Sequence, residues 1–277
     1  MKQILVASDF STNASHALRY ALSLAVRLNM EVAVVHAIHP TEGINNSTYN
    51  AIFIEDYYAR KRAALQEWTD QVVQENKYNG LKVRTVVEVG YLRNVVTKYV
   101  EYTDVSFLVM GITGATGIKG IVGSNASMAV TKLRIPTLIV PPESNLSATP
   151  VITLATDYKT TKLSVRDVKA LNRILKLSDP RKLEILHISE KELDDKLVRN
   201  GEKKMRQLLP NVEINFNYVD EDDTRPSHAI VDFVENNQTD ILCLVKRNHN
   251  MIYRLFASST VNEVLNRSVK AILVLHE

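Results

Sequence analysis

Glycines gather in one short stretch of the sequence, and the polar residues behind them suit the binding of an anion. Five of the nine glycines fall between Gly111 and Gly123, and Ser124 and Asn125 follow directly. Glycine permits positive φ and lets backbone N–H groups approach a phosphate without a Cβ in the way. A helix starting near Ser124 would add partial positive charge, and the Ser124 hydroxyl could cap it and donate to a phosphate oxygen. The stretch predicts a cradle for a phosphorylated small molecule, and the alternative is a tight turn that binds nothing.

The stretch matches neither of two familiar phosphate-binding motifs. No Gly-Lys-Ser or Gly-Lys-Thr occurs in the chain, so there is no P-loop. The dinucleotide fingerprint would follow the first strand, where the sequence reads ASDFSTN. The chemistry of the loop must therefore be judged from the elements around it.

Strand and helix patterns alternate along the first half of the chain. Apolar runs predict strands at 3–8, 31–37, 82–89, 104–110 and 137–140. Helical spacing predicts helices within 11–30 and 91–103 and at about 53–77 and 124–132, the first capped by Ser11, Thr12 or Asn13. Strands this apolar need cover on both faces, which predicts a doubly wound α/β domain with a mostly parallel five-stranded sheet and helices on both faces. Ligands of such sheets bind beyond the carboxyl ends of the strands, where the glycine stretch begins.

The same pattern begins again in the second half. VITLATDY repeats QILVASDF and places Asp157 opposite Asp9, while LEILHIS repeats VAVVHAI and places His187 opposite His36. Later, TDILCLV repeats TDVSFLV, and SVKAILVLHE repeats RIPTLIVPPE. Four matched strands in the same order indicate a tandem duplication. We predict domains at 1–142 and 151–277, joined by a proline-containing linker at 143–150.

The second copy has lost the glycines. Lys246, His249 and Ser258 stand where the first copy has Gly111, Gly114 and Gly123. An anion could be held there only by side chains, from Lys246, Arg247, His249 and Arg254, and a solvated basic loop is the alternative. The second domain is therefore expected to be degenerate and mainly structural.

Composition excludes several classes of protein. The net charge of +3 is spread evenly and gives no basic face for nucleic acid. No apolar run approaches the roughly 20 residues of a membrane span, and the first residues do not read as a signal peptide. The single cysteine, Cys243, lies in an apolar run and reads as a buried small hydrophobe. We expect a cytoplasmic protein that binds neither membrane nor nucleic acid.

Other polar groups give weaker indications. His36 and His39 are close together, but only Glu42 accompanies them, so no metal site is predicted; His36 ends an apolar strand as His187 does, which favours a shared structural role. Ser11, His16 and Asp9 lack a nucleophile-elbow pattern, so no catalytic triad is predicted. No catalytic residue is assigned.

Four segments together resemble a known family. ILVASDFS, VVHA, MGITGATGIKGIVGS and IPTLIVPP are similar to the universal stress protein family in its tandem two-domain form. Its ATP-binding members carry Gly, two residues, Gly, nine residues and then Gly-Ser or Gly-Thr. Here Gly111 and Gly114 fit that pattern, and eight residues rather than nine precede Gly123 and Ser124.

The resemblance implies a function and a set of binding residues. The chain would be a stress-response protein that binds ATP or a related adenine nucleotide, with Mg²⁺ as a possible companion, and acts as a sensor or regulator rather than an enzyme, weak ATP hydrolysis aside. Asp9 would face the ribose and phosphates, and the backbone of Ala37 would face the adenine. The remaining nucleotide-binding residues, along the ribose and phosphates, would be Gly111, Gly114, Gly123, Ser124 and Asn125.

Two alternatives remain open. With its shortened loop the chain could be a dimerising scaffold that binds no nucleotide, or it could be an adenylylating enzyme whose catalytic residues the sequence does not reveal. The final strands of the halves, TLIV and AILVL, are apolar edges that could pair within or between chains. We expect a pseudo-dimer inside the chain, with a homodimer also possible.

Overall fold

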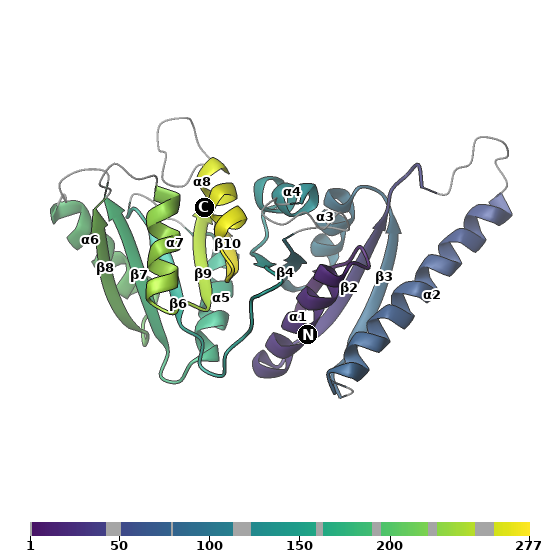
Figure 1. The fold of residues 1–277 in the computed structure, drawn as a ribbon, viewed down its shortest axis with the longest axis horizontal. Helices are drawn as coiled ribbons and strands as arrows, with labels where there is room; N and C mark the ends of the chain where they lie inside the picture. The colour runs from purple at the N-terminus through teal and green to yellow at the C-terminus, as the bar shows by residue number, and fades with distance from the viewer. Residues whose placement is uncertain are drawn as a thin grey trace.

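A single ten-stranded sheet runs through the protein (Figure 1). The computed structural model describes residues 2–42, 51–78, 80–112, 123–158, 163–189, 195–220, 226–246 and 258–277. The strands of the first half are β1 (Gln3–Ala7), β2 (Glu31–Ile38), β3 (Val83–Val89), β4 (Val105–Gly111) and β5 (Thr137–Val140). Those of the second half are β6 (Ile152–Thr156), β7 (Lys182–Ser189), β8 (Glu213–Asp220), β9 (Ile241–Lys246) and β10 (Ala271–His276).

Each half repeats one strand order. The full order is β3-β2-β1-β4-β5-β10-β9-β6-β7-β8, and every pairing inside a half is parallel. In each half the first strand lies between the second and the fourth, so the chain moves outward in one direction and then returns to build the other side. The predicted fold class, two tandem doubly wound α/β units, is confirmed.

Helices cover both faces of the sheet. One face carries α1 (Thr12–Leu28), α2 (Ala51–Glu75), α5 (Val165–Ile174) and α6 (Asp195–Leu208). The other carries α3 (Leu92–Tyr102), α4 (Ser124–Lys132), α7 (Pro226–Asn236) and α8 (Ser258–Arg267). Successive strand residues point to opposite faces, so Ile4 and Val6 pack toward α1 while Leu5 and Ala7 join the other core. Burial on both faces explains why the strands read as continuous apolar runs.

The two halves meet at an antiparallel pair of strands. Leu138 of β5 pairs with Leu273 of β10, and Ile139 pairs with Ile272. Both hydrophobic cores contain residues from both halves, which lie side by side along the longest axis of the molecule (Figure 1). The predicted pairing of the last strands is confirmed, and it occurs within the chain.

The segment predicted to be a linker is fastened to both halves. Arg27 of α1 donates to the carbonyls of Ser147 at 2.7 Å and Ala148 at 2.6 Å, and also to Leu177 in the second half at 2.6 Å. Asp240 accepts hydrogen bonds from the Ser147 hydroxyl and the Val151 amide. The boundary at 143–150 stays a prediction, because the sheet continues through both halves.

Most elements lie where the sequence predicts them. The structure gives α4 the predicted bounds, extends β2 by one residue to Ile38, and places α2 at Ala51–Glu75. Cys243 is buried, and burial raises the pKa of its thiol to about 12, in keeping with the predicted buried hydrophobe. Among the described residues, no helix is both long enough and apolar enough to span a bilayer.

Candidate functional site

A cavity of about 330 Å³ lies at the carboxyl ends of β1, β2 and β4. This is the point where the strand order of the first half reverses, the usual ligand position of such sheets. Six of the seven predicted binding residues line it: Asp9, Ala37, Gly111, Gly123, Ser124 and Asn125. Gly114 lies outside the described residues. That these residues bind a nucleotide stays a prediction, but the fold brings them to one place.

Gly111 ends β4 directly beneath the start of α1. A Cβ at this position would lie 3.0 Å from the carbonyl oxygen of Asn13 and 3.1 Å from its carbonyl carbon. Backbone atoms cannot easily move away, so a larger residue would push α1 from the strand end. At the other end of the loop, the Gly123 amide donates to the Ile112 carbonyl at 2.8 Å, which holds both loop ends together at the cavity.

The N-terminus of α4 faces the cavity without a side-chain cap. Gly123 is the N-cap residue and supplies no side-chain hydrogen bond. The prediction that Ser124 caps this helix is therefore wrong, because Ser124 is already the first helical residue. The first amides of a helix have no partner within it, so those following Gly123 are available to an anion.

Asp9 is held by the turn between β1 and α1. Its Oδ1 accepts from the Ser11 amide at 3.0 Å, and Ser11 caps α1 by accepting from the Ala14 amide at 3.1 Å. No lysine or arginine occurs among the described residues that line the cavity. A phosphate there would meet backbone amides and one carboxylate, a setting that suits Mg²⁺, which commonly binds one or two carboxylates together with substrate phosphates.

His36 has a structural role. Its Nδ1 donates to the Ser8 carbonyl at 2.8 Å, and its ring lies 4.6 Å from the ring of Phe10. Burial lowers its pKa, which keeps the imidazole neutral at pH 7. His187 repeats the arrangement, with Nδ1 3.1 Å from the Thr156 carbonyl and its ring stacked on Tyr158. In the described part of the chain, no group of three His, Cys, Asp or Glu residues is placed to hold a metal.

Lys246 connects the two halves. Its half-buried ammonium group donates to the Thr131 carbonyl at the end of α4, where a cation also complements the helix dipole. Burial lowers the pKa of Lys246, and the charges of Lys132 and Arg134 lower it further. This contact occupies the Lys246 side chain, which the sequence suggested as an anion ligand. Arg247, His249 and Arg254 lie outside the described residues, and Ser258 is the first residue of α8.

A polar cluster that the sequence did not predict lies where the chain leaves β2. Glu42 accepts from the Tyr57 hydroxyl at 2.6 Å and pairs with Lys61 at 2.7 Å. The Lys61 ammonium also lies 5.9 Å from the centre of the Phe10 ring. The hydrogen bond from Lys61, followed by that from Tyr57, lowers the pKa of Glu42 to about 2. No spacing signal could reveal this cluster, because the residues meet only after α2 folds back on the sheet.

Comparison with known proteins gives one family. Residues 1–141 match the model of the universal stress protein family. No curated protein is similar enough in sequence to count as a relative.

Solved structures share the fold. A universal stress protein from Archaeoglobus fulgidus DSM 4304 is 20% identical with a TM-score of 0.73, and the alignment covers 98% of this chain and 97% of that one. A putative universal stress protein from Pseudomonas aeruginosa UCBPP-PA14 is 12% identical with a TM-score of 0.57, covering 99% and 92%. A universal stress protein in complex with cAMP is 20% identical with a TM-score of 0.37, and the alignment covers 50% of this chain and 96% of that one. This TM-score is too low for its ligand to bear on this chain.

Proposed function

The chain belongs to the universal stress protein family, and we propose that its first half binds an adenine nucleotide, ATP in the first instance, as the signal of a nucleotide-dependent regulator. One observation carries the proposal. Six residues from four separate segments, predicted from the sequence to bind nucleotide, line one cavity at the strand-order reversal.

Each part of the cavity suits a part of the ligand. The uncapped amides after Gly123 suit phosphate oxygens, with the Ser124 hydroxyl and the Asn125 side chain beside them. Gly111 lets a sugar or phosphate approach the backbone closely, and the edge of Ala37 suits an adenine ring. Asp9 would hold Mg²⁺, which would supply the positive charge that the described lining lacks.

We propose binding rather than turnover. Asp9 and His36 are the titratable residues among the described lining. His36 donates through Nδ1 to the Ser8 carbonyl, so its lone pair lies on Nε2, which is buried and has no hydrogen-bond partner in the described part of the chain. Asp9 is engaged by the turn amide of Ser11. Because His36 Nε2 is buried away from solvent and Asp9 would hold Mg²⁺, neither residue is placed to take a proton from an attacking water, so hydrolysis would be weak at most. We place this regulator in the cytoplasm, in line with a single buried cysteine that forms no internal disulfide.

Calorimetric titration with ATP and Mg²⁺ tests the proposal, with AMP and cAMP as further ligands. The informative variant is Ser124→Asp, because an acidic residue in the first turn favours the helix and repels a phosphate. The matched control is Ser259→Asp in the first turn of α8 in the second half. We expect micromolar binding to the wild type, loss of more than about tenfold in Ser124→Asp, and no change in the control.

Other results would change the assignment. No binding heat from the wild type, with the fold intact by circular dichroism, would overturn the proposal and favour the scaffold. Equal losses in both serine variants would mean a general charge effect and no site at α4. Release of AMP or pyrophosphate only when a second substrate is added would point to an adenylylating enzyme.

A further inference from the structure

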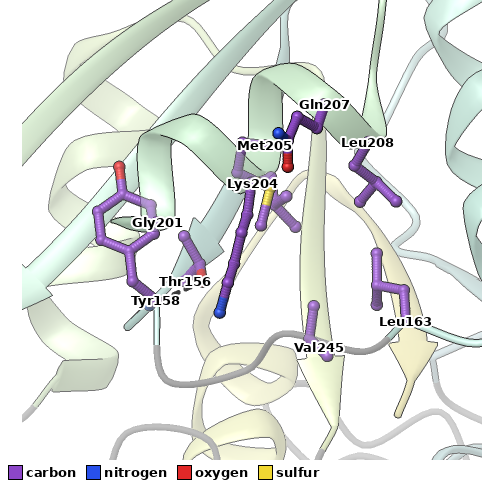
Figure 2. Close-up of a pocket in the computed structure, with 10 residues that line it drawn as sticks. Thr156, Tyr158, Leu163, Gly201, Lys204, Met205, Gln207, Leu208 and Val245 are labelled. Carbon is purple, nitrogen blue, oxygen red and sulfur yellow. Dashed lines mark hydrogen bonds between the residues drawn. The ribbon is translucent and has the colours of Figure 1, made fainter. Parts of the chain in front are cut away.

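A second cavity, of about 430 Å³, opens in the second half at the carboxyl ends of β6 and β9 (Figure 2). Leu154 and Val245 of these strands line it from the sheet, and Gly201, Lys204, Met205 and Leu208 line it from α6. It lies on the opposite face of the sheet from α7 and α8. Its volume falls in the range of small-molecule sites, about 300–1,000 Å³.

The first helix of the second half begins later than its counterpart in the first half. In the first half, α1 begins at Thr12, and its early residues Ala14, Ala17 and Leu18 are buried over the sheet. Asp157 follows Asp9 by 148 residues, so the counterpart of Thr12 is residue 160, which lies outside the described residues. The helix α5 begins at Val165, the counterpart of Ala17, and its side chain is 71% exposed. Leu163, which lines the cavity, is the counterpart of Ser15 in the first turn of α1.

The lining is apolar at one side and polar at the other. Leu154, Leu163, Met205, Leu208 and Val245 supply the apolar surface, and Thr156, Lys204 and Gln207 the polar groups. In Figure 2 the Lys204 side chain runs down from α6 past Thr156, while Leu163, Leu208 and Val245 lie on the other side of the space. Lys204 has no hydrogen bond or ion pair to any residue in the described ranges. Lys204 is exposed, so its ammonium lies where the apolar hollow meets solvent, without an acidic partner in the described part of the chain.

One wall of the cavity is rigid. The buried Tyr158 ring packs so closely on α6 that a Cβ at Gly201 would lie 2.3 Å from its Cγ. The other side of the ring stacks on His187, with ring centres 4.5 Å apart. Because Tyr158 is fixed between a helix and a strand, it cannot swing in to fill the space.

We propose that this cavity binds a small amphipathic carboxylate of the medium-chain fatty acid type. The apolar chain would lie against Leu154, Met205 and Val245, and the carboxylate would pair with Lys204. One unpartnered cation matches one monoanion, and the apolar lining favours an aliphatic body over a nucleotide. This assignment is independent of nucleotide binding in the first half.

Calorimetry on the full chain tests the assignment with decanoate as the probe, below the concentration at which it forms micelles. We expect saturable binding of one decanoate, with octanoate about tenfold weaker because two fewer methylenes are buried. Lys204→Gln should weaken decanoate binding about threefold, because Lys204 is exposed and solvent screens its pairing with a carboxylate. The matched control, Lys203→Gln, makes the same charge change on the same helix outside the lining and should bind as wild type does.

A second variant tests occupancy of the cavity itself. Leu163→Trp fills the space from a position that is only partly buried, so it should remain folded and abolish decanoate binding. If circular dichroism shows that Leu163→Trp is unfolded, the assignment is tested by the comparison of octanoate with decanoate and by the comparison of Lys204→Gln with Lys203→Gln. No saturable binding, equal losses in both lysine variants, or equal affinity for octanoate and decanoate would overturn the assignment. Retained binding in a folded Leu163→Trp would do the same.

Discussion

Single residues repeat their roles across the duplication even where the loop sequences have diverged. Ser8 and Thr156 each accept a hydrogen bond from the amide two residues later, and both following aromatic residues, Phe10 and Tyr158, have positive φ. Each aromatic ring packs on a buried histidine of the next strand. The turn after the first strand is therefore a structural unit, kept in both halves. The glycines after the fourth strand belong to the first half alone.

At the residue scale, the Glu42 cluster predicts a pH dependence. The folded pKa of Glu42 is about 2, below its ordinary 4.5, so its stabilising effect is fully present above about pH 4.5 and disappears as pH falls toward 2. Glu42→Gln should cost about 1 kcal/mol of unfolding free energy at pH 7, because partial exposure screens the pair, and almost nothing near pH 2. Urea unfolding of both proteins from pH 7 to pH 2.5 measures the difference.

The control for this prediction is an exposed ion pair on α2, the helix that carries Tyr57 and Lys61. Glu55 and Arg62 approach to 3.0 Å, but their side chains are 75% and 53% exposed. Glu55→Gln should leave the unfolding free energy unchanged at every pH. A Glu42→Gln effect that persists undiminished at pH 2.5 would show that packing, and not charge, stabilises the cluster.

At the residue scale, some features of the candidate site can be predicted from the sequence and others cannot. Glycines and the acidic residue at a strand end are visible in the sequence because their backbone roles depend on residue type and order. The Glu42 cluster, the contact of Lys246 with Thr131 and the lack of a cap at α4 are not visible. They depend on how distant segments meet after folding, over as many as 115 residues between Lys246 and Thr131.

At the scale of elements, the strands were predictable and some helix starts were not. Strands buried on both faces must be apolar throughout, which leaves a clear signal. The late start of α5 depends on Ser164, which caps the helix by accepting from the Asp167 amide. Asp167 in turn accepts from the amide of His276 in β10, 109 residues away. That tertiary contact fixes the helix start.

The packing of α6 on Tyr158 predicts an unusual response to alanine. Glycine in a helix interior usually costs about 1 kcal/mol relative to alanine, so Gly201→Ala would ordinarily stabilise. Here the new Cβ would lie 2.3 to 2.7 Å from Tyr158 atoms that cannot move away. We expect a loss of about 2 kcal/mol in unfolding free energy, measured by chemical denaturation.

Gly80 supplies the matched control for Gly201. No atom lies within 4 Å of a Cβ built there, so Gly80→Ala should change stability by less than about 0.5 kcal/mol. Tyr158→Ala combined with Gly201→Ala should be less destabilised than the two single losses added together, because the clash is removed. Strict additivity would mean that the Tyr158 ring does not oppose the alanine.

At the scale of the whole molecule, the duplication produced one continuous body. A lone five-stranded half would leave the edge of its fifth strand exposed, and exposed apolar edges attract other chains. Here β5 and β10 cover each other, and both hydrophobic cores continue across that junction. The sequence predicted this pairing from two apolar runs, although it offered the choice between pairing within and between chains. The fastening by Arg27 was not predictable, because its partners are backbone carbonyls, which every residue has.

This junction predicts that the two halves unfold together. Trp68 is the only tryptophan, so its fluorescence reports the first half, while circular dichroism reports the whole chain. In urea, both signals should give one transition with the same midpoint.

Arg27→Met removes three hydrogen bonds to carbonyls of the connecting segment and the second half. It should lower the unfolding free energy by about 2 kcal/mol, and both midpoints should move together to lower urea concentration. Arg60→Met, which removes an exposed pair with Asp56, should change neither. A fluorescence midpoint separate from that of circular dichroism in the wild type would mean that the halves are independent units, and the shared cores would then contribute little to their coupling.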